Sequence, residues 1–199
     1  MKRLVLSLLL CMAASPVLAE GYHQQTLVTG ELEHGGFGAV VLKFTEINKE
    51  FGVLVGGRGG WIINHSLVIG AGGYGLSNDF EIESAPSNWG LGYGGLDLEY
   101  IARSSELIHV SAQTLIGAGG IGYRYDRYGG DWEDWDGEAF FVLEPGVNIM
   151  LNVVENFRIG LGASYRYVRG IDDDDDIDWT SDADLSEPSI VLTLKFGIF

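Results

Sequence analysis

Hydrophobic and polar residues alternate along most of the chain with a period of two, the pattern of a β-strand whose two faces differ. In residues 107–118, for example, His109, Ser111 and Gln113 alternate with apolar or small residues. Such strands can cross a bilayer when they have about 9–11 tilted residues. We predict strands of sufficient length at 35–46, 51–64, 67–77, 89–102, 107–125, 138–152, 157–170 and 186–199.

The lengths of the connections also alternate. Short turns are expected at 64–66, 103–106 and 153–156, whereas longer connections span 78–88, 126–137 and 171–185. Only the short connection at 47–50 departs from this order. Outer-membrane barrels have short periplasmic turns and longer extracellular loops. The sequence therefore predicts an all-β fold, an antiparallel transmembrane β-barrel of about eight strands.

The N-terminus has the features of an export signal. Lys2 and Arg3 precede a short apolar stretch, and Val17-Leu18-Ala19 supplies a small-residue cleavage pattern. The stretch is shorter than the roughly 20 residues of a membrane-spanning helix. We predict a signal peptide at 1–19, a short periplasmic segment at 20–34, the barrel at 35–199, and export to the outer membrane.

Acidic residues dominate the charge and gather in two connections. The chain has 28 acidic and 12 basic residues, a net charge of -16 that becomes -18 once Lys2 and Arg3 are removed. Nucleic acid is thus not an expected partner. Six acids lie in 126–138 and nine in 171–187, together 15 of the 28. Because a soluble barrel would scatter charge over its outward strand positions, this clustering favours a membrane barrel over a lipocalin-like one.

Aromatic residues on the expected outward face form two groups, as at the two interfaces of a membrane barrel. One group lies toward the periplasmic end and the other toward the opposite end: Trp61, Tyr100 and Phe157, then Phe51, Phe141, Tyr165 and Tyr167.

These features together resemble the small outer-membrane barrels of the OmpA/OmpX type, and the chain ends in Phe199 as many of them do. That resemblance implies outer-membrane lipid, lipopolysaccharide and the barrel-assembly machinery as partners. Gly197, Lys195 and Thr193 hold positions where the usual terminal signal repeats apolar residues. The block FGVLVGGRGGWIINH at 51–65 resembles one in a family of Gram-negative proteins, mainly over residues 35–77, and implies a common barrel without any particular activity.

The strand phases place nine titratable side chains toward the lumen. Pairing about the turns predicts Glu144 opposite Ser164 with Arg166 as diagonal neighbour, and Glu99 near His109. An eight-stranded barrel is just wide enough for side chains to fill, so we expect an interior plugged by paired charges. A narrow polar pore or proton path is the alternative. The nine are Lys43, Arg58, Asp97, Glu99, His109, Glu144, Arg158, Arg166 and Lys195.

The acidic connections offer hard oxygen ligands, of which calcium takes six to eight. No EF-hand spacing is present. Solvated acidic loops and weak Ca²⁺ or Mg²⁺ binding beside lipopolysaccharide therefore both stay open, and no other cofactor is expected. The candidate ligands are Asp131, Glu133, Asp134, Asp136, Asp172, Asp173, Asp174, Asp175 and Asp176.

Taken together, the predicted barrel, its plugged lumen and its acidic connections favour a structural or cell-surface interaction role. A narrow channel for small polar solutes is the second hypothesis, and a lipid-modifying enzyme is the third. Catalysis of that kind needs a nucleophile within reach of a base. His23, His34, His65 and His109 all lie outside the expected outer loops, and no motif frames His65 beside Ser66. We therefore predict no enzyme activity.

Overall fold

A computed structural model describes residues 32–78, 89–125, 134–171 and 179–199 of the chain. The predicted signal peptide at 1–19 lies outside these ranges. No helix in the described ranges is both long and apolar enough to cross a membrane. The strands are β1 (His34–Ile47), β2 (Glu50–Ile63), β3 (Leu67–Leu76), β4 (Trp89–Ala102), β5 (Ile108–Tyr125), β6 (Asp134–Val154), β7 (Phe157–Tyr165), β8 (Tyr167–Arg169) and β9 (Pro188–Ile198).

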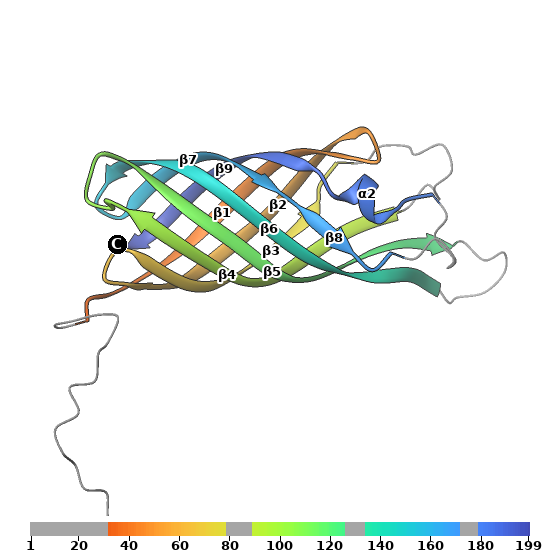
Figure 1. Cartoon of the computed structure of the whole chain (residues 1–199), viewed down its shortest axis with the longest axis horizontal. Coiled ribbons are helices and arrows are strands. Elements are labelled where there is room, and N and C mark those ends of the chain that lie inside the picture. The colour runs from red at the N-terminus through yellow and green to blue at the C-terminus, as the bar shows by residue number, and fades with distance from the viewer. Residues whose placement is uncertain (1–31, 79–88, 126–133, 172–178) are drawn as a thin grey trace, which may run out of the picture. The chain divides into compact units, whose positions relative to one another are not determined.

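The strands close into one antiparallel barrel (Figure 1). From β1 to β7 each strand pairs with the next one along the chain, β7 also pairs with β9, and β1 closes the ring by pairing with β9. β7 and β8 both pair with β6 and form two parts of one barrel strand, interrupted at Arg166. The barrel thus has eight strands, which confirms the predicted fold.

The β1–β2 turn has the backbone conformation that two-residue hairpins require, and the three-residue β2–β3 turn also begins in the left-handed region. Asn48 and Lys49 join β1 to β2 with φ values of 55° and 68°. Asn64 and His65 start the next turn with φ values of 50° and 55°. Asparagine tolerates this left-handed region well, so these turns suit their sequence.

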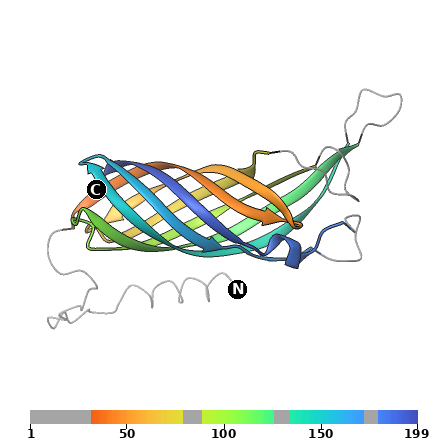
Figure 2. The same cartoon turned by 90° about the horizontal axis from the view of Figure 1, so that it is seen from above.

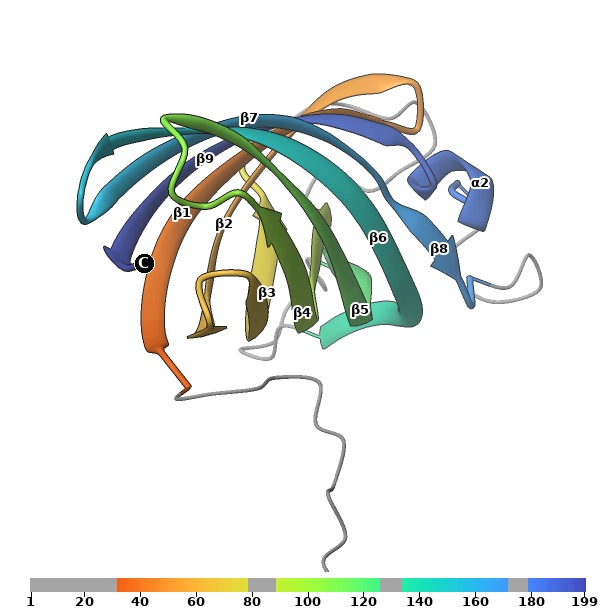
Figure 3. The ribbon, with the colours of Figure 1, turned by 60° about the vertical axis from the view of Figure 1, so that its left-hand side comes forward.

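The turns after β2, β4 and β6 lie at one end of the barrel, which we call the short-turn end, together with Phe199 (Figures 1 and 3). The opposite end is called the long-loop end. There β6 begins at Asp134 rather than at the predicted residue 138, and Asp134 pairs with Tyr125. The predicted loop at 126–137 was therefore too long, because β6 keeps its pairing with β5 back to Asp134, whereas β5 ends at Tyr125 as predicted.

The outward face of the barrel is apolar. Exposed apolar side chains lie on β6, β7 and β9, for example Val147, Ile149, Leu161 and Ile190. Trp61, Tyr100 and Phe196 are exposed toward the short-turn end, and Phe51, Phe141, Tyr165 and Tyr167 toward the long-loop end. The alternation read from the sequence thus places apolar residues outside, whereas the interior holds the polar residues together with an apolar core that includes Val41, Leu54 and Val142.

Glycine admits large side chains into this interior. A Cβ atom at Gly56 would lie 2.1 Å from the backbone oxygen of Gly73 and 2.5 Å from the ring of Tyr74. A Cβ at Gly119 would lie 2.5 Å from Tyr93. These clashes show that the glycines keep the wall thin where the two tyrosines enter the lumen.

A short segment completes the wall at the long-loop end. The helix α2 (Asp182–Leu185) lies there, on the side away from Phe199 (Figure 2). Ser186 Oγ accepts a hydrogen bond from Val168 N in β8, and Asn48 N donates to Asp184 O. The residues before β9 thus bridge β8 and the β1–β2 turn.

The same segment corrects the predicted loop at 171–185. Its described part, residues 179–187, is packed rather than solvated: Leu185 is fully buried, and Trp179 contacts Trp89 at a ring-centroid distance of 5.5 Å. Ser181 caps α2 by accepting a hydrogen bond from Asp184 N. Apolar anchors therefore override the acidic character of the segment. We call residues 179–187 the strap.

Candidate functional site

The barrel interior brings together nine titratable residues. Eight of them lie on seven strands, and Arg166 lies between β7 and β8. All nine side chains expected in the lumen belong to residues that are at most 7% exposed. They comprise five cations, three carboxylates and one histidine. Charges buried to this degree need close partners, because removing each ion from water costs roughly several kcal/mol.

Lys43 and Glu144 form the first ion pair, from opposite parts of the barrel wall. Lys43 Nζ lies 2.8 and 2.7 Å from the two carboxylate oxygens of Glu144. Tyr93 donates to the same carboxylate at 2.8 Å, and Ser164 donates at 2.6 Å. The ammonium group also lies 3.3 Å from the ring centroid of Tyr74, a cation–π contact. These five residues form the Lys43 cluster.

Arg58 holds the second group of charges. Its Nη2 atom lies 2.8 Å from Asp97 Oδ2 and 2.5 Å from Glu99 Oε2. Lys195 Nζ approaches Glu99 Oε2 at 2.8 Å from β9. Gln113 accepts a hydrogen bond from Arg58 Nη1. These residues form the Arg58 cluster, in which two cations face two carboxylates.

Two of the three lumen arginines lie outside both clusters, and among the described residues neither has a carboxylate within ion-pair distance. Arg166 is fully buried and donates from Nε to Leu185 O at 2.7 Å, so it ties the strap to the barrel. Arg158 lies near the short-turn end and stacks 3.9 Å above the ring centroid of Phe199. His109 is held by a 3.2 Å contact between Nδ1 and Glu106 O.

The observed partners differ from the predicted ones because the strand registers differ. In the register of β6 and β7, Gly146 rather than Glu144 lies opposite Ser164, and the β6 side shifts register between Asn152 and Val154. Ser164 still reaches Glu144, but the ion pair is with Lys43 instead of Arg166.

The pairing predicted about the β4–β5 turn is wrong in the same way. Glu99 lies opposite Gln113, and His109 contacts the turn itself. Turn length sets strand register, so an error of a few residues at a turn moves every cross-strand partner.

Charge alone did not identify Tyr74, Tyr93 and Asn148 as members of the site. The two tyrosines, together with Gln113 and Ser164, supply the uncharged contacts to the ion pairs. Asn148 adds a hydrogen bond to Gln113 at 3.3 Å. Each lies on the inward phase of its strand, so the alternation itself was the signal that could have identified them.

Most of the candidate metal ligands fall outside the described ranges: Asp131, Glu133 and Asp172–Asp176. Asp134 and Asp136 lie within β6, where a loop was predicted. Within the described parts of the chain, no group of three or more histidine, cysteine or acidic side chains is arranged to hold a metal ion.

Comparison with known proteins gives a likeness in fold. No protein-family model and no curated protein matches the chain. The N-terminal β-barrel domain of Pseudomonas aeruginosa OprF superposes with a TM-score of 0.53 at 12% identity, covering 84% of this chain and 100% of that one. Neisserial surface protein A (NspA) superposes with a TM-score of 0.53 at 14% identity, covering 85% and 99%. The chain therefore has the eight-stranded antiparallel fold of the small outer-membrane barrels.

Proposed function

We propose that this protein is a small outer-membrane barrel with a structural or cell-surface interaction role, whose lumen is plugged by paired charges. The observation that carries the proposal is that nine titratable side chains are buried inside the barrel, beside an apolar core, while large apolar side chains are also exposed over its outside. In water, charged side chains are stable on the outside and large apolar patches are not.

Membrane insertion is supported by the outward face. Its exposed apolar side chains continue over neighbouring strands, with aromatic residues toward both ends. A contiguous apolar surface of this extent on a monomer is typical of contact with lipid. In this proposal the short-turn end faces the periplasm, and outer-membrane lipid and lipopolysaccharide surround the wall. The barrel-assembly machinery would insert the exported chain.

The plug is supported by the interior contacts. The Lys43 cluster and the Arg58 cluster link β1 to β6, β2 to β4 and β9 to β4 across the lumen. A conducting path through such a narrow barrel would need these side chains to separate, which would strand buried charges. We therefore favour a closed lumen over the narrow channel, and no catalytic role is proposed.

An interaction role at the surface is supported by analogy with a similar structure. One of the similar structures is named a surface protein, NspA. The acidic segments at the long-loop end would then present negative charge to a basic partner or to divalent cations, with binding that weakens as salt screens exposed charges.

Two measurements test the proposal. Membrane fractionation followed by electrophoresis of boiled and unboiled samples should place the chain in the outer membrane and show heat-modifiable migration. Planar-bilayer recordings of the folded protein should then show no steady single-channel steps. Recovery of the chain as a soluble periplasmic protein would overturn the membrane assignment, and regular conductance steps would favour the narrow channel.

A further inference from the structure

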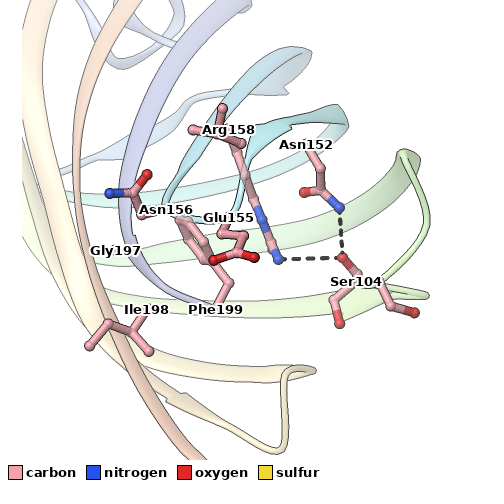
Figure 4. A pocket seen from close by; sticks show the side chains of 10 residues that line it. Ser104, Asn152, Glu155, Asn156, Arg158, Gly197, Ile198 and Phe199 are labelled. Carbon is pink, nitrogen blue, oxygen red and sulfur yellow. Dashed lines mark hydrogen bonds between the residues drawn. The ribbon is translucent and has the colours of Figure 1, made fainter.

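A pocket opens at the short-turn end, separate from the two charge clusters (Figure 4). Its volume is about 590 Å³, within the roughly 300–1,000 Å³ typical of small-molecule sites. The β4–β5 turn supplies Ser104 and Ser105, and the β6–β7 turn supplies Glu155 and Asn156. Arg158 and Phe199 complete the lining from β7 and the end of β9.

Arg158 is the unusual group in this lining. The residue is 7% exposed, yet among the described residues its guanidinium makes one hydrogen bond, a 3.3 Å contact from Nη2 to Ser104 O. Ser104 O also accepts from Asn152 Nδ2 at 3.0 Å, so it keeps a partner if Arg158 turns away. Arginine carries five N–H donors. Most of the donors of this cation are therefore available to an acceptor in the pocket.

The ring of Phe199 fixes the direction in which these donors point. It lies 3.9 Å from the guanidinium carbon and covers one face of the group. A planar guanidinium held in this way binds a carboxylate through two parallel hydrogen bonds. The free edge of Arg158 thus suits an anionic group with two oxygens.

The lining also contains a carboxylate that does not neutralise Arg158. Glu155 is exposed in the β6–β7 turn, and no ion pair joins it to Arg158 within the described structure. A simple anion would be attracted by Arg158 but repelled by Glu155. A ligand that carries an ammonium group as well as a carboxylate satisfies both side chains.

We propose that this pocket binds a small zwitterion, an amino acid or short peptide, with its carboxylate on Arg158 and its ammonium group toward Glu155. The site needs only the folded barrel, so it goes beyond the proposed function and does not depend on a closed lumen. Asn156, Ser104 and Ser105 would supply further hydrogen bonds to the ligand.

Calorimetric titration of the folded full chain in detergent tests the site with alanine, dialanine and trialanine, which share their two charged ends and differ in spacing. At least one is expected to bind. Its N-acetyl and carboxamide derivatives should each bind roughly tenfold or more weakly, since each loses a charge-assisted contact. The absence of binding by all three probes would overturn the proposal.

Variants separate the roles of the two side chains. Arg158→Gln should weaken binding of the best probe roughly tenfold to a hundredfold, whereas Arg103→Gln, at an exposed arginine of the β4–β5 turn, should leave it unchanged. Glu155→Gln should also weaken binding. Tighter binding by Glu155→Gln would overturn the zwitterion assignment, because it would show that Glu155 repels the ligand. Glu155 lies in an exposed turn, so this variant tests the site even if Arg158→Gln fails to fold.

Discussion

Lys43 and Glu144 are 101 residues apart in the chain, and inside the barrel Lys43 Nζ lies 2.7 Å from Glu144 Oε2. One residue is on β1 and the other on β6, which are not neighbouring strands. Their contact therefore crosses the lumen. It links the folding of the first strand to the closure of the barrel, because neither charge has this partner until the ring is complete.

Removing one member of this pair should be costly. Glu144→Ala leaves Lys43 buried without its carboxylate, and we expect a loss of about 3–5 kcal/mol in the free energy of unfolding. Urea unfolding in lipid vesicles measures it. The matched control is Glu50→Ala at an exposed position of β2, which should change stability by less than about 0.5 kcal/mol. Equal losses in both variants would contradict the buried ion pair.

The double variant Lys43→Met with Glu144→Leu tests whether the ion pair adds stability to the barrel or only offsets the cost of burying its two charges. Replacing both charges removes the unpaired ammonium group, so stability should return to within about 1–2 kcal/mol of the wild type. The same unfolding measurement applies. If the double variant is as unstable as Glu144→Ala, the loss arises from packing and not from the stranded charge.

Arginine substitutions at two depths in the bilayer test whether the outward face contacts lipid. Leu161 is 59% exposed near the middle of β7, and Leu161→Arg should destabilise the inserted barrel by about 2–4 kcal/mol. Ile198→Arg, at the short-turn end, should cost only about 0–1 kcal/mol. Folding titrations into vesicles distinguish them. In a water-soluble barrel an exposed arginine would be harmless at both positions, so two neutral variants would refute the lipid-facing assignment.

The strap should open separately from the barrel. Leu185 is fully buried, and Leu185→Ala should weaken strap packing by about 2–5 kcal/mol. We expect faster proteolysis within residues 179–187 while heat-modifiable migration persists. Ala183→Ser, at an exposed position of α2, serves as the control. Unchanged protection in Leu185→Ala would show that this side chain does not anchor the strap.

The aspartate run can be exchanged at constant length. Replacing Asp172–Asp176 by serine should leave the barrel intact, because Ile171 and Trp179 on either side are buried and stay unchanged in the variant. Boiled and unboiled electrophoresis checks this result. Calcium calorimetry on the same two proteins tests the cation hypothesis: heat that disappears in the serine variant supports it, and identical traces assign the run to solvation alone.

The sequence alone determines which residues face the interior of this barrel. The alternation in 107–118 put His109, Ser111 and Gln113 on one face, and all three are buried. The same phase rule applied to Lys43, Glu99 and Glu144. Which face a strand residue occupies depends on its own backbone, whose side chains point alternately to opposite sides, so local pattern was sufficient for the fold and for membership of the interior.

The choice of partners was decided only by the tertiary structure. Glu144 meets Lys43 because ring closure brings β1 across from β6, and Arg58 meets Glu99 through the combined registers of three strands. Register depends on the exact length of each turn and on the shear of the closed barrel. The burial of the strap was likewise decided by the tertiary structure. Leu185 and Trp179 are buried because the strap packs beside β8 in the closed barrel. An alternating pattern is local, whereas contacts across a lumen are a property of the closed ring.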